Sequence, residues 1–325
     1  MQKRVVGVCY GGVKEAEAAR ISARVAELGF EAQFLPSDGF VGPIPDGWVD
    51  DCEVIFGNIP EGRIPQAKQL KWLQTGSAGV AQYCEPGVLP DDILLTNASG
   101  GYGVGISEYM VGQMFAMLKR FPAYLDNQRK HSWQRLGRVG AVQGLKVTVV
   151  GLGDIGSEFA QRAHLLGASV RGVKRSRTET PDYLERLYIT KEMDEALKDA
   201  DLVALALPGV ADTEGVLNRE RLLALKPGCY IINVGRGNAI DQDALVELLN
   251  AGHIGGAALD VFVEEPIPES DPIWDAQNVI ITPHVSGGIT FDLTVQTIID
   301  LFLENLASYA AGRPFARTVN RKLGY

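Results

Sequence analysis

The chain has 325 residues, of which 46% are hydrophobic and 22% charged, so its composition is that of a folded globular protein with room for two domains. A formal net charge of -9 argues against non-specific binding to nucleic acids or to anionic membrane surfaces. Four cysteines without C-x-x-C spacing, a first segment that reads as a strand and not as a signal peptide, and the lack of an apolar run of about 18–20 residues predict a cytoplasmic protein with reduced thiols and no membrane span.

The first hundred residues predict a small α/β layer. Residues 4–10, RVVGVCY, have the pattern of a buried strand, and residues 14–28 have that of an amphipathic helix ending at Gly29. Further strands are expected at residues 31–35, 52–57, 70–75 and 93–97. The glycines after the first strand lack the spacing of a dinucleotide-binding loop, so we interpret them as a turn.

The composition changes between residues 97 and 105, NASGGYGVG, just before a helical pattern at residues 106–120. We interpret this glycine-rich stretch as a hinge between domains. The predicted limits are residues 1–98 plus 292–325 for one domain and residues 99–291 for the other. The last segment opens with a helix at residues 292–311. Its assignment to the first domain is inferred from the general architecture of such chains and not from a sequence pattern.

Residues 147–156, VTVVGLGDIG, combine a buried strand with a G-x-G-x-x-G turn, and a helical pattern with an apolar stripe follows. Gly151 permits the tight turn, Gly153 lets the backbone approach a pyrophosphate, and Gly156 lets the helix pack closely on the strand. The stretch therefore predicts a dinucleotide site, with Asp154 and Ile155 as further contacts.

Five more strands are expected after this fingerprint, at residues 169–173, 202–207, 230–234, 257–261 and 279–282. Together with residues 147–150 they give six strands interleaved with helices, which is the pattern of a doubly wound parallel sheet. The predicted fold class is α/β with two Rossmann-like domains, in which the cofactor domain is inserted into a smaller, flavodoxin-like substrate domain.

The turn after the second of these strands indicates which dinucleotide is bound. In NAD-binding sheets an acidic residue about 20 positions beyond the fingerprint accepts hydrogen bonds from the ribose. Here that register falls on Lys174, followed by Arg175, Ser176 and Arg177, and no acid occurs from Phe159 to Thr178. Three cations and a hydroxyl suit a 2′-phosphate, so NADP(H) is favoured while NAD(H) stays possible; the alternative is a solvated basic turn.

Three candidate sites lie at the ends of predicted strands, where open α/β sheets bind ligands. Arg236, between two glycines, could capture a carboxylate through its guanidinium fork, although a surface turn explains it equally well. The second site is residues 259–266, a strand that leads into an acidic turn, and the third is TPHVSGG at residues 282–288. His284 there suits general acid–base chemistry, and the other three histidines lack metal-ligand spacing, so no metal site is expected.

The motifs GLGDIG, NVGRG, LDVFVEEP and TPHVSG, in this order and at these separations, closely resemble the D-2-hydroxyacid dehydrogenase family over nearly the whole chain. The resemblance implies a catalytic set of Arg236, Glu265 and His284, with Glu264 as the neighbouring candidate for the acid. It places the substrate carboxylate on Arg236 and on the backbone of Ser77, Ala78 and Gly79. The further cofactor contacts that it implies are Pro208, Thr213, Val234, Asp260 and Gly287.

The resemblance implies hydride transfer between NADP(H) and a small D-2-hydroxy acid or its 2-keto acid, such as glyoxylate or hydroxypyruvate. It also implies a homodimer, formed through the long helix after the hinge. A phosphoglycerate dehydrogenase is the nearest alternative, but its phosphate needs basic groups near the substrate loop, and TGSAGVAQYCEPG has none. A nicotinamide-sensing corepressor with the same fold is less favoured, because the sequence shows no long polar extension.

Overall fold

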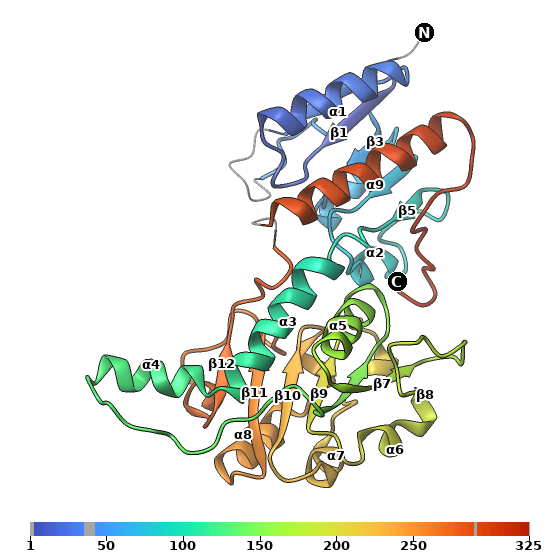
Figure 1. Ribbon diagram of the computed structural model, residues 1–325. Coiled ribbons are helices and arrows are strands. Elements are labelled where there is room, and N and C mark those ends of the chain that lie inside the picture. Colours follow the sequence, from blue (N-terminus) through green and yellow to red (C-terminus); the bar gives the residue numbers. More distant parts are fainter. Residues whose placement is uncertain (1–2, 36–42, 289–290, 325) are drawn as a thin grey trace. The chain divides into compact units, whose positions relative to one another are not determined.

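The computed structural model describes residues 3–35, 43–288 and 291–324. The chain divides into two compact units, Met1–Tyr102 with Gly288–Tyr325 (unit 1) and Gly103–Gly287 (unit 2), which are coloured by sequence in Figure 1. Each unit is built on its own parallel sheet with helices against it, so the expected α/β class with two Rossmann-like domains is confirmed. Among the described residues, no helix combines the length and the apolarity that a bilayer span requires.

Unit 1 holds a five-stranded parallel sheet in the order β2-β1-β3-β4-β5. Its elements are β1 (Val5–Val8), α1 (Glu15–Glu27), β2 (Glu31–Phe34), β3 (Cys52–Phe56), β4 (Trp72–Gln74), α2 (Ala81–Cys84), β5 (Leu94–Thr96) and α9 (Asp292–Ala310). The central strands β1 and β3 are buried along their whole length because helices and loops cover both faces of the sheet. All five strands expected from the sequence are present, each shorter than its pattern.

An aromatic stack fixes α9 on this sheet. The rings of Phe302 on α9 and Phe56 on β3 are stacked with their centroids 4.2 Å apart, and Trp72 on β4 lies 5.7 Å from Phe302. All three side chains are fully buried. Burial of such large aromatic side chains is among the largest favourable terms that a small core has.

Unit 2 holds a seven-stranded parallel sheet in the order β12-β11-β10-β9-β6-β7-β8. Its strands are β6 (Lys146–Val150), β7 (Ser169–Lys174), β8 (Arg186–Ile189), β9 (Leu202–Leu205), β10 (Cys229–Asn233), β11 (Ile254–Leu259) and β12 (Val279–Ile281). The expectation of six strands was therefore wrong by one, β8. This strand has only four residues and lies at the sheet edge, where Leu187 and Tyr188 are buried beside an exposed Arg186, so it has too few residues for a periodic signal.

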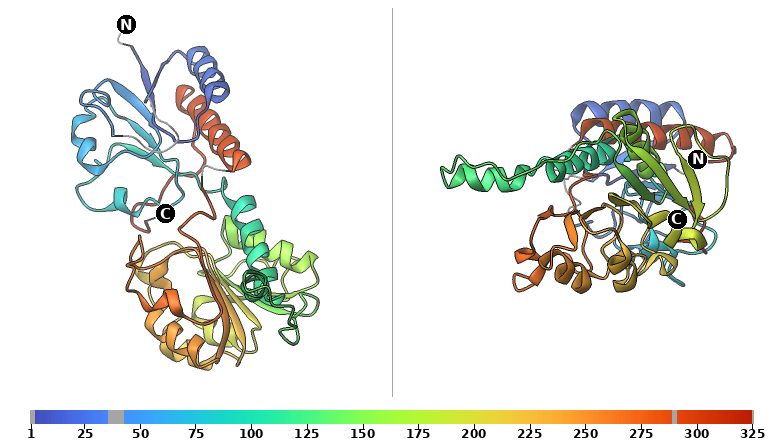
Figure 2. Two further views of the ribbon diagram at one scale, coloured as in Figure 1. Left: turned by 90° about the vertical axis from the view of Figure 1, so that its left-hand side faces the viewer. Right: turned by 60° about the horizontal axis from the view of Figure 1, so that its bottom comes forward.

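Helices cover both faces of the larger sheet, as Figure 2 shows. They are α3 (Gly103–Leu118), α5 (Asp154–Leu165), α6 (Met193–Leu197), α7 (Arg219–Ala224) and α8 (Gln242–Asn250). The helix α3 packs against α5 and buries Met110, Met114 and Met117. A further helix, α4 (Phe121–Arg129), projects with the following loop away from the body of unit 2 (Figure 1).

Candidate active site

The fingerprint residues form the turn between β6 and α5 and the first turn of α5, and they are Gly151, Gly153, Asp154, Ile155 and Gly156. Gly151 has φ +96°, and a Cβ on it would lie 2.5 Å from the carbonyl oxygen of Ala206. A Cβ on Gly156 would lie 1.8 Å from the carbonyl oxygen of Gly151, so only glycine permits this approach of helix to strand. A Cβ on Gly153 would meet nothing within 4 Å, so the backbone there is open to a ligand phosphate at the helix start.

The basic turn lies at the same edge of the sheet. The N–H of Gly151 donates to the carbonyl of Val173 over 3.0 Å, which places the end of β7, Lys174, beside the fingerprint turn. Arg177 forms a two-pronged ion pair with Glu192, over 2.7 and 2.9 Å, which the sequence did not indicate. Lys174 forms no ion pair with an acid of the described chain, so it is more available to an anion than Arg177 is.

Two other predicted cofactor contacts follow β9 and β10. The hydroxyl of Thr213 donates to the carbonyl of Pro208 over 2.6 Å and so closes the loop after β9. Val234 is buried directly after β10, and Gly287 is the last residue of unit 2. Loops at the carboxyl ends of β6, β7, β9 and β10 thus contribute these candidates, as expected for a doubly wound sheet.

Arg236 follows β10 in a turn that Asn233 holds. The side chain of Asn233 accepts from the N–H of Gly235 over 3.0 Å and donates to the carbonyl of Arg236 over 2.9 Å. The flanking glycines allow close packing, because a Cβ on Gly237 would lie 1.9 Å from the carbonyl carbon of Phe262. The Arg236 guanidinium donates to the carbonyl of Gly235 and pairs with no carboxylate of the described residues.

His284 and Glu265 contact each other directly. Nδ1 of His284 lies 2.7 Å from Oε2 of Glu265, and Oε1 of the same carboxylate accepts the N–H of Phe262 over 2.8 Å. The two side chains are 49% and 37% exposed, so the pair is reachable from solvent. Glu264, the other candidate acid, makes no hydrogen bond or ion pair with His284. Because Nδ1 faces Glu265, Nε2 is the nitrogen left for a ligand.

Asp260 holds the turn that carries His284, a role that the sequence analysis missed. This fully buried carboxylate at the end of β11 accepts from the hydroxyl of Thr282 over 2.6 Å and from the N–H groups of Val285 and Ser286 over 3.0 Å each. Its own carbonyl accepts from the N–H of His284, which has φ +52°, an unusual value for a residue other than glycine. The only sequence signal was an acid at a strand end.

Tyr109 on α3 extends this network. Its hydroxyl lies 2.6 Å from that of Thr282, and burial raises the pKa of Tyr109 to about 12. The phenol is therefore protonated at neutral pH and can donate to Thr282, which in turn donates to Asp260. Such a chain of partly buried, satisfied hydrogen bonds fixes the position of the turn at residues 282–286.

The predicted substrate loop, Ser77 to Gly79, belongs to unit 1, where it follows β4. These residues are partly exposed, and the side chains that hold them are amides and hydroxyls rather than charged groups. Arg236, Glu265 and His284 belong to unit 2.

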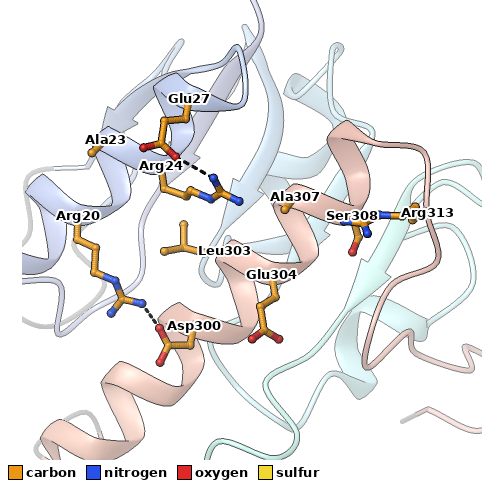
Figure 3. Close-up of a pocket in the computed structure, with 10 residues that line it drawn as sticks. All are labelled: Arg20, Ala23, Arg24, Glu27, Asp300, Leu303, Glu304, Ala307, Ser308 and Arg313. Atoms are coloured by element: carbon orange, nitrogen blue, oxygen red, sulfur yellow. Dashed lines mark hydrogen bonds and ion pairs between the residues drawn. The ribbon is translucent and has the colours of Figure 1, made fainter.

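A groove in unit 1 lies elsewhere, between α1 and α9 (Figure 3). It has a volume of about 710 Å³ and is lined by charges that pair within it, Arg20 with Asp300 and Arg24 with Glu27. Across the described chain, no cluster of histidine, cysteine or acidic residues has the geometry of a metal site.

Known proteins resemble this chain in both sequence and fold. The family model "D-isomer specific 2-hydroxyacid dehydrogenase, NAD binding domain" matches residues 111–286. Glyoxylate/hydroxypyruvate reductase A of Serratia proteamaculans is 30% identical over 272 residues, covering 82% of this chain and 85% of its own length. D-3-phosphoglycerate dehydrogenase of Bacillus subtilis is 32% identical over 230 residues, 70% of this chain; this chain spans less than half the length of that relative, 43%.

Two solved structures match nearly the whole chain. A D-isomer specific 2-hydroxyacid dehydrogenase of Xanthobacter autotrophicus, crystallised with NADPH and MES, has a TM-score of 0.82 at 26% identity and covers 100% of both chains. A family protein of Aeromonas salmonicida has a TM-score of 0.84 at 26% identity and covers 98% of this chain and 99% of its own.

Proposed function

The chain belongs to the D-isomer specific 2-hydroxyacid dehydrogenase family, and we propose that it interconverts a small 2-keto acid and the corresponding D-2-hydroxy acid with NADP(H). The observation that carries this proposal is the contact of 2.7 Å between His284 and Glu265 at the carboxyl edge of the sheet that bears the dinucleotide fingerprint. An imidazole held by a carboxylate beside a nicotinamide site is suited to proton transfer during reduction of a carbonyl.

Each residue of the set has a separate chemical role. Arg236 orients the substrate carboxylate and polarises the keto group through its guanidinium. His284 donates the proton on Nε2 to the carbonyl oxygen, which becomes the hydroxyl, and takes it back in the reverse direction. Glu265 holds Nδ1–H and so fixes the ring orientation. The reduced nicotinamide, when bound, supplies the hydride to the carbonyl carbon.

The cofactor preference rests on the turn after β7. Lys174, Arg175 and Ser176 would surround the 2′-phosphate. Arg177 contributes less than Lys174, because Arg177 is paired with Glu192. The open backbone at Gly153 fits a pyrophosphate. The Xanthobacter autotrophicus protein with NADPH supports the same preference. NADH is expected to bind more weakly than NADPH, because it lacks the 2′-phosphate.

The substrate is small and singly charged in this proposal, as glyoxylate and hydroxypyruvate are. The side chains that hydrogen-bond to residues 76–79 are those of Asn58, Thr75, Asn97, Tyr102 and the loop itself, and none of them is a cation. A 3-phosphorylated substrate would need basic groups, so a phosphoglycerate dehydrogenase is disfavoured. A corepressor with the same fold is the less favoured alternative, and turnover of 2-keto acids separates it from the enzyme.

The arm from residue 119 to residue 144 supports a homodimer. Figure 2 shows α4 standing clear of the rest of unit 2, and the arm leaves Trp133 102%, Phe121 52% and Leu125 50% exposed. Aromatic and aliphatic groups at this exposure are costly in water and typical of an interface. A second copy of the chain is the partner that the family resemblance indicates.

The protein is placed in the cytoplasm by the same proposal. Its four cysteines are free thiols, three of them buried, as a reducing compartment favours. The net charge of -9 disfavours nucleic acid and anionic membranes as partners.

A substrate screen tests the proposal directly. NADPH oxidation is followed at 340 nm with glyoxylate, hydroxypyruvate, pyruvate, bulkier 2-keto acids and 3-phosphohydroxypyruvate. We expect the small unphosphorylated acids to give the highest kcat/KM. A preference for 3-phosphohydroxypyruvate would instead indicate a phosphoglycerate dehydrogenase. The absence of turnover with every 2-keto acid would overturn the proposal.

A further inference from the structure

The loop after β4 in unit 1 has all its carbonyl groups occupied. The carbonyl of Gly76 accepts from the Tyr102 hydroxyl, and that of Ser77 accepts from the N–H of Ala98 over 3.0 Å. The Ala78 carbonyl accepts from Nδ2 of Asn97 over 2.9 Å, and the Gly79 carbonyl accepts from the Ser77 hydroxyl over 2.8 Å. Each carbonyl oxygen from Gly76 to Gly79 therefore accepts a hydrogen bond, which fixes the orientation of its peptide group.

Most backbone N–H groups of the same loop, in contrast, have no hydrogen-bond acceptor in the described chain. Oδ1 of Asn58 accepts the N–H of Gly76 over 3.0 Å, but the next three N–H groups, of Ser77, Ala78 and Gly79, have no acceptor in the described chain. These three residues are partly exposed. Successive unpaired N–H groups form a concave binding site for an anionic oxygen, so this loop can receive a carboxylate.

Two tyrosines meet at Gly76, and only one of them bonds to it. A Cβ on Gly76 would lie 2.3 Å from Cδ2 of Tyr10, so the Tyr10 ring is packed on the glycine backbone. The Tyr10 hydroxyl is buried and has no hydrogen-bond partner among the described residues. The Tyr102 hydroxyl donates to the Gly76 carbonyl over 2.5 Å. Burial raises the pKa of Tyr102 to about 12, so this phenol stays a donor at working pH.

We propose that Tyr102 is a positioning residue for the substrate carboxylate, because its hydroxyl holds the Gly76 carbonyl and thereby presents the free N–H groups of Ser77 to Gly79. This inference rests on the proposed function. Tyr102 is also the last residue of this segment of unit 1, directly before α3 begins at Gly103. Neither the fingerprint nor the strand-end motifs indicate this residue, since it is 26 positions away from Gly76.

The test compares Tyr102→Phe with Tyr10→Phe. Both changes remove the hydroxyl of a tyrosine that contacts Gly76, but only the first breaks a hydrogen bond. For Tyr102→Phe we expect the KM for glyoxylate or hydroxypyruvate to rise roughly three- to tenfold, the fold-change of one lost hydrogen bond. We expect kcat to change less than about twofold, because a loss of uniform binding raises KM alone. Tyr10→Phe should leave both constants unchanged, and both variants should keep the wild-type Kd for NADPH.

Amide hydrogen exchange gives a readout that does not depend on turnover. Faster exchange of the Ala98 amide, whose N–H donates to the Ser77 carbonyl, is expected in Tyr102→Phe and not in Tyr10→Phe. An unchanged KM and unchanged exchange in Tyr102→Phe, or an equal rise in KM in both variants, would overturn the inference. A wild-type protein without 2-keto acid turnover would instead defeat the proposed function, and the exchange result would still decide whether Tyr102 holds the loop.

Discussion

His284 and Glu265 lie 19 residues apart in the chain, yet Nδ1 of the histidine is 2.7 Å from Oε2 of the glutamate. The second carboxylate oxygen accepts the N–H of Phe262, so the glutamate is itself held in place. The histidine is held in turn through its own N–H, which donates to the carbonyl of the buried Asp260. Both members of the pair are thus held by backbone hydrogen bonds. Since Nδ1 contacts Glu265, Nε2 is the nitrogen that can exchange a proton with the substrate.

Two adjacent glutamates test the role of this contact. Glu265→Gln removes the carboxylate that holds Nδ1–H, so we expect kcat to fall roughly tenfold or more. Glu264→Gln changes an exposed neighbour without a contact to His284, and its kcat should stay within about twofold of the wild type. Steady-state kinetics with a saturating 2-keto acid measure both, and equal losses in the two variants would contradict the assignment of Glu265.

The basic turn makes a prediction about cofactor choice. Lys174→Ala should raise the KM for NADPH by roughly tenfold, because a charge-assisted hydrogen bond to the 2′-phosphate is lost. The KM for NADH should barely change, since NADH lacks that phosphate. Arg177→Ala should have the smaller effect of the two, because Arg177 is paired with Glu192. Preference of the wild type for NADH would refute this account of the turn.

The hydrogen bonds of Glu53 in unit 1 predict that the stability of the fold decreases at acidic pH. Two hydrogen bonds from Arg4, over 3.0 and 2.8 Å, and one from Tyr309 hold the pKa of this carboxyl below its usual range, and Arg4 is the main cause. A carboxyl whose pKa is lower in the folded state stabilises the fold above its unfolded pKa, about 4.3. That stabilisation is lost as the pH falls through the lower folded value.

Glu53→Gln should therefore lower the free energy of unfolding at pH 7 by roughly 1–3 kcal/mol. The gap between variant and wild type should begin to narrow once the pH falls below the unfolded-state pKa of about 4.3, and it should close as the pH falls through the lower folded value. Urea unfolding at pH 7 and pH 3.5 measures this. Glu31→Gln, which breaks only the exposed pair with Lys3, serves as the control and should have little effect at either pH. A gap that does not depend on pH would contradict the prediction.

The arm predicts an oligomeric state that light scattering can measure. The wild type should have a mass of about twice 35.1 kDa. The double variant Leu125→Ser with Trp133→Ser should shift towards the single-chain mass, because it removes apolar groups that an interface would bury. Leu223→Ser, a change of equal chemistry on α7, should leave the mass unchanged. A single-chain mass for the wild type would exclude the dimer.

Much of the fold was predictable, because strands buried on both faces are continuous apolar runs and the fingerprint glycines are fixed in spacing. The strand β8 was not, since four residues at an edge carry no periodic signal. The contacts of Asn233 and Asp260 were missed for another reason: each holds a turn that comes close only after the sheet has formed. The pairing of His284 with Glu265 followed from resemblance, and no local pattern reports it.

The central claim is that His284 moves the proton, and His284→Gln tests it most directly. Glutamine keeps a polar side chain of comparable size but cannot act as an acid near neutral pH. We expect kcat for 2-keto acid reduction to fall roughly 100-fold or more, while the Kd for NADPH, measured by fluorescence, stays within about twofold of the wild type. Undiminished turnover with intact NADPH binding would contradict the account.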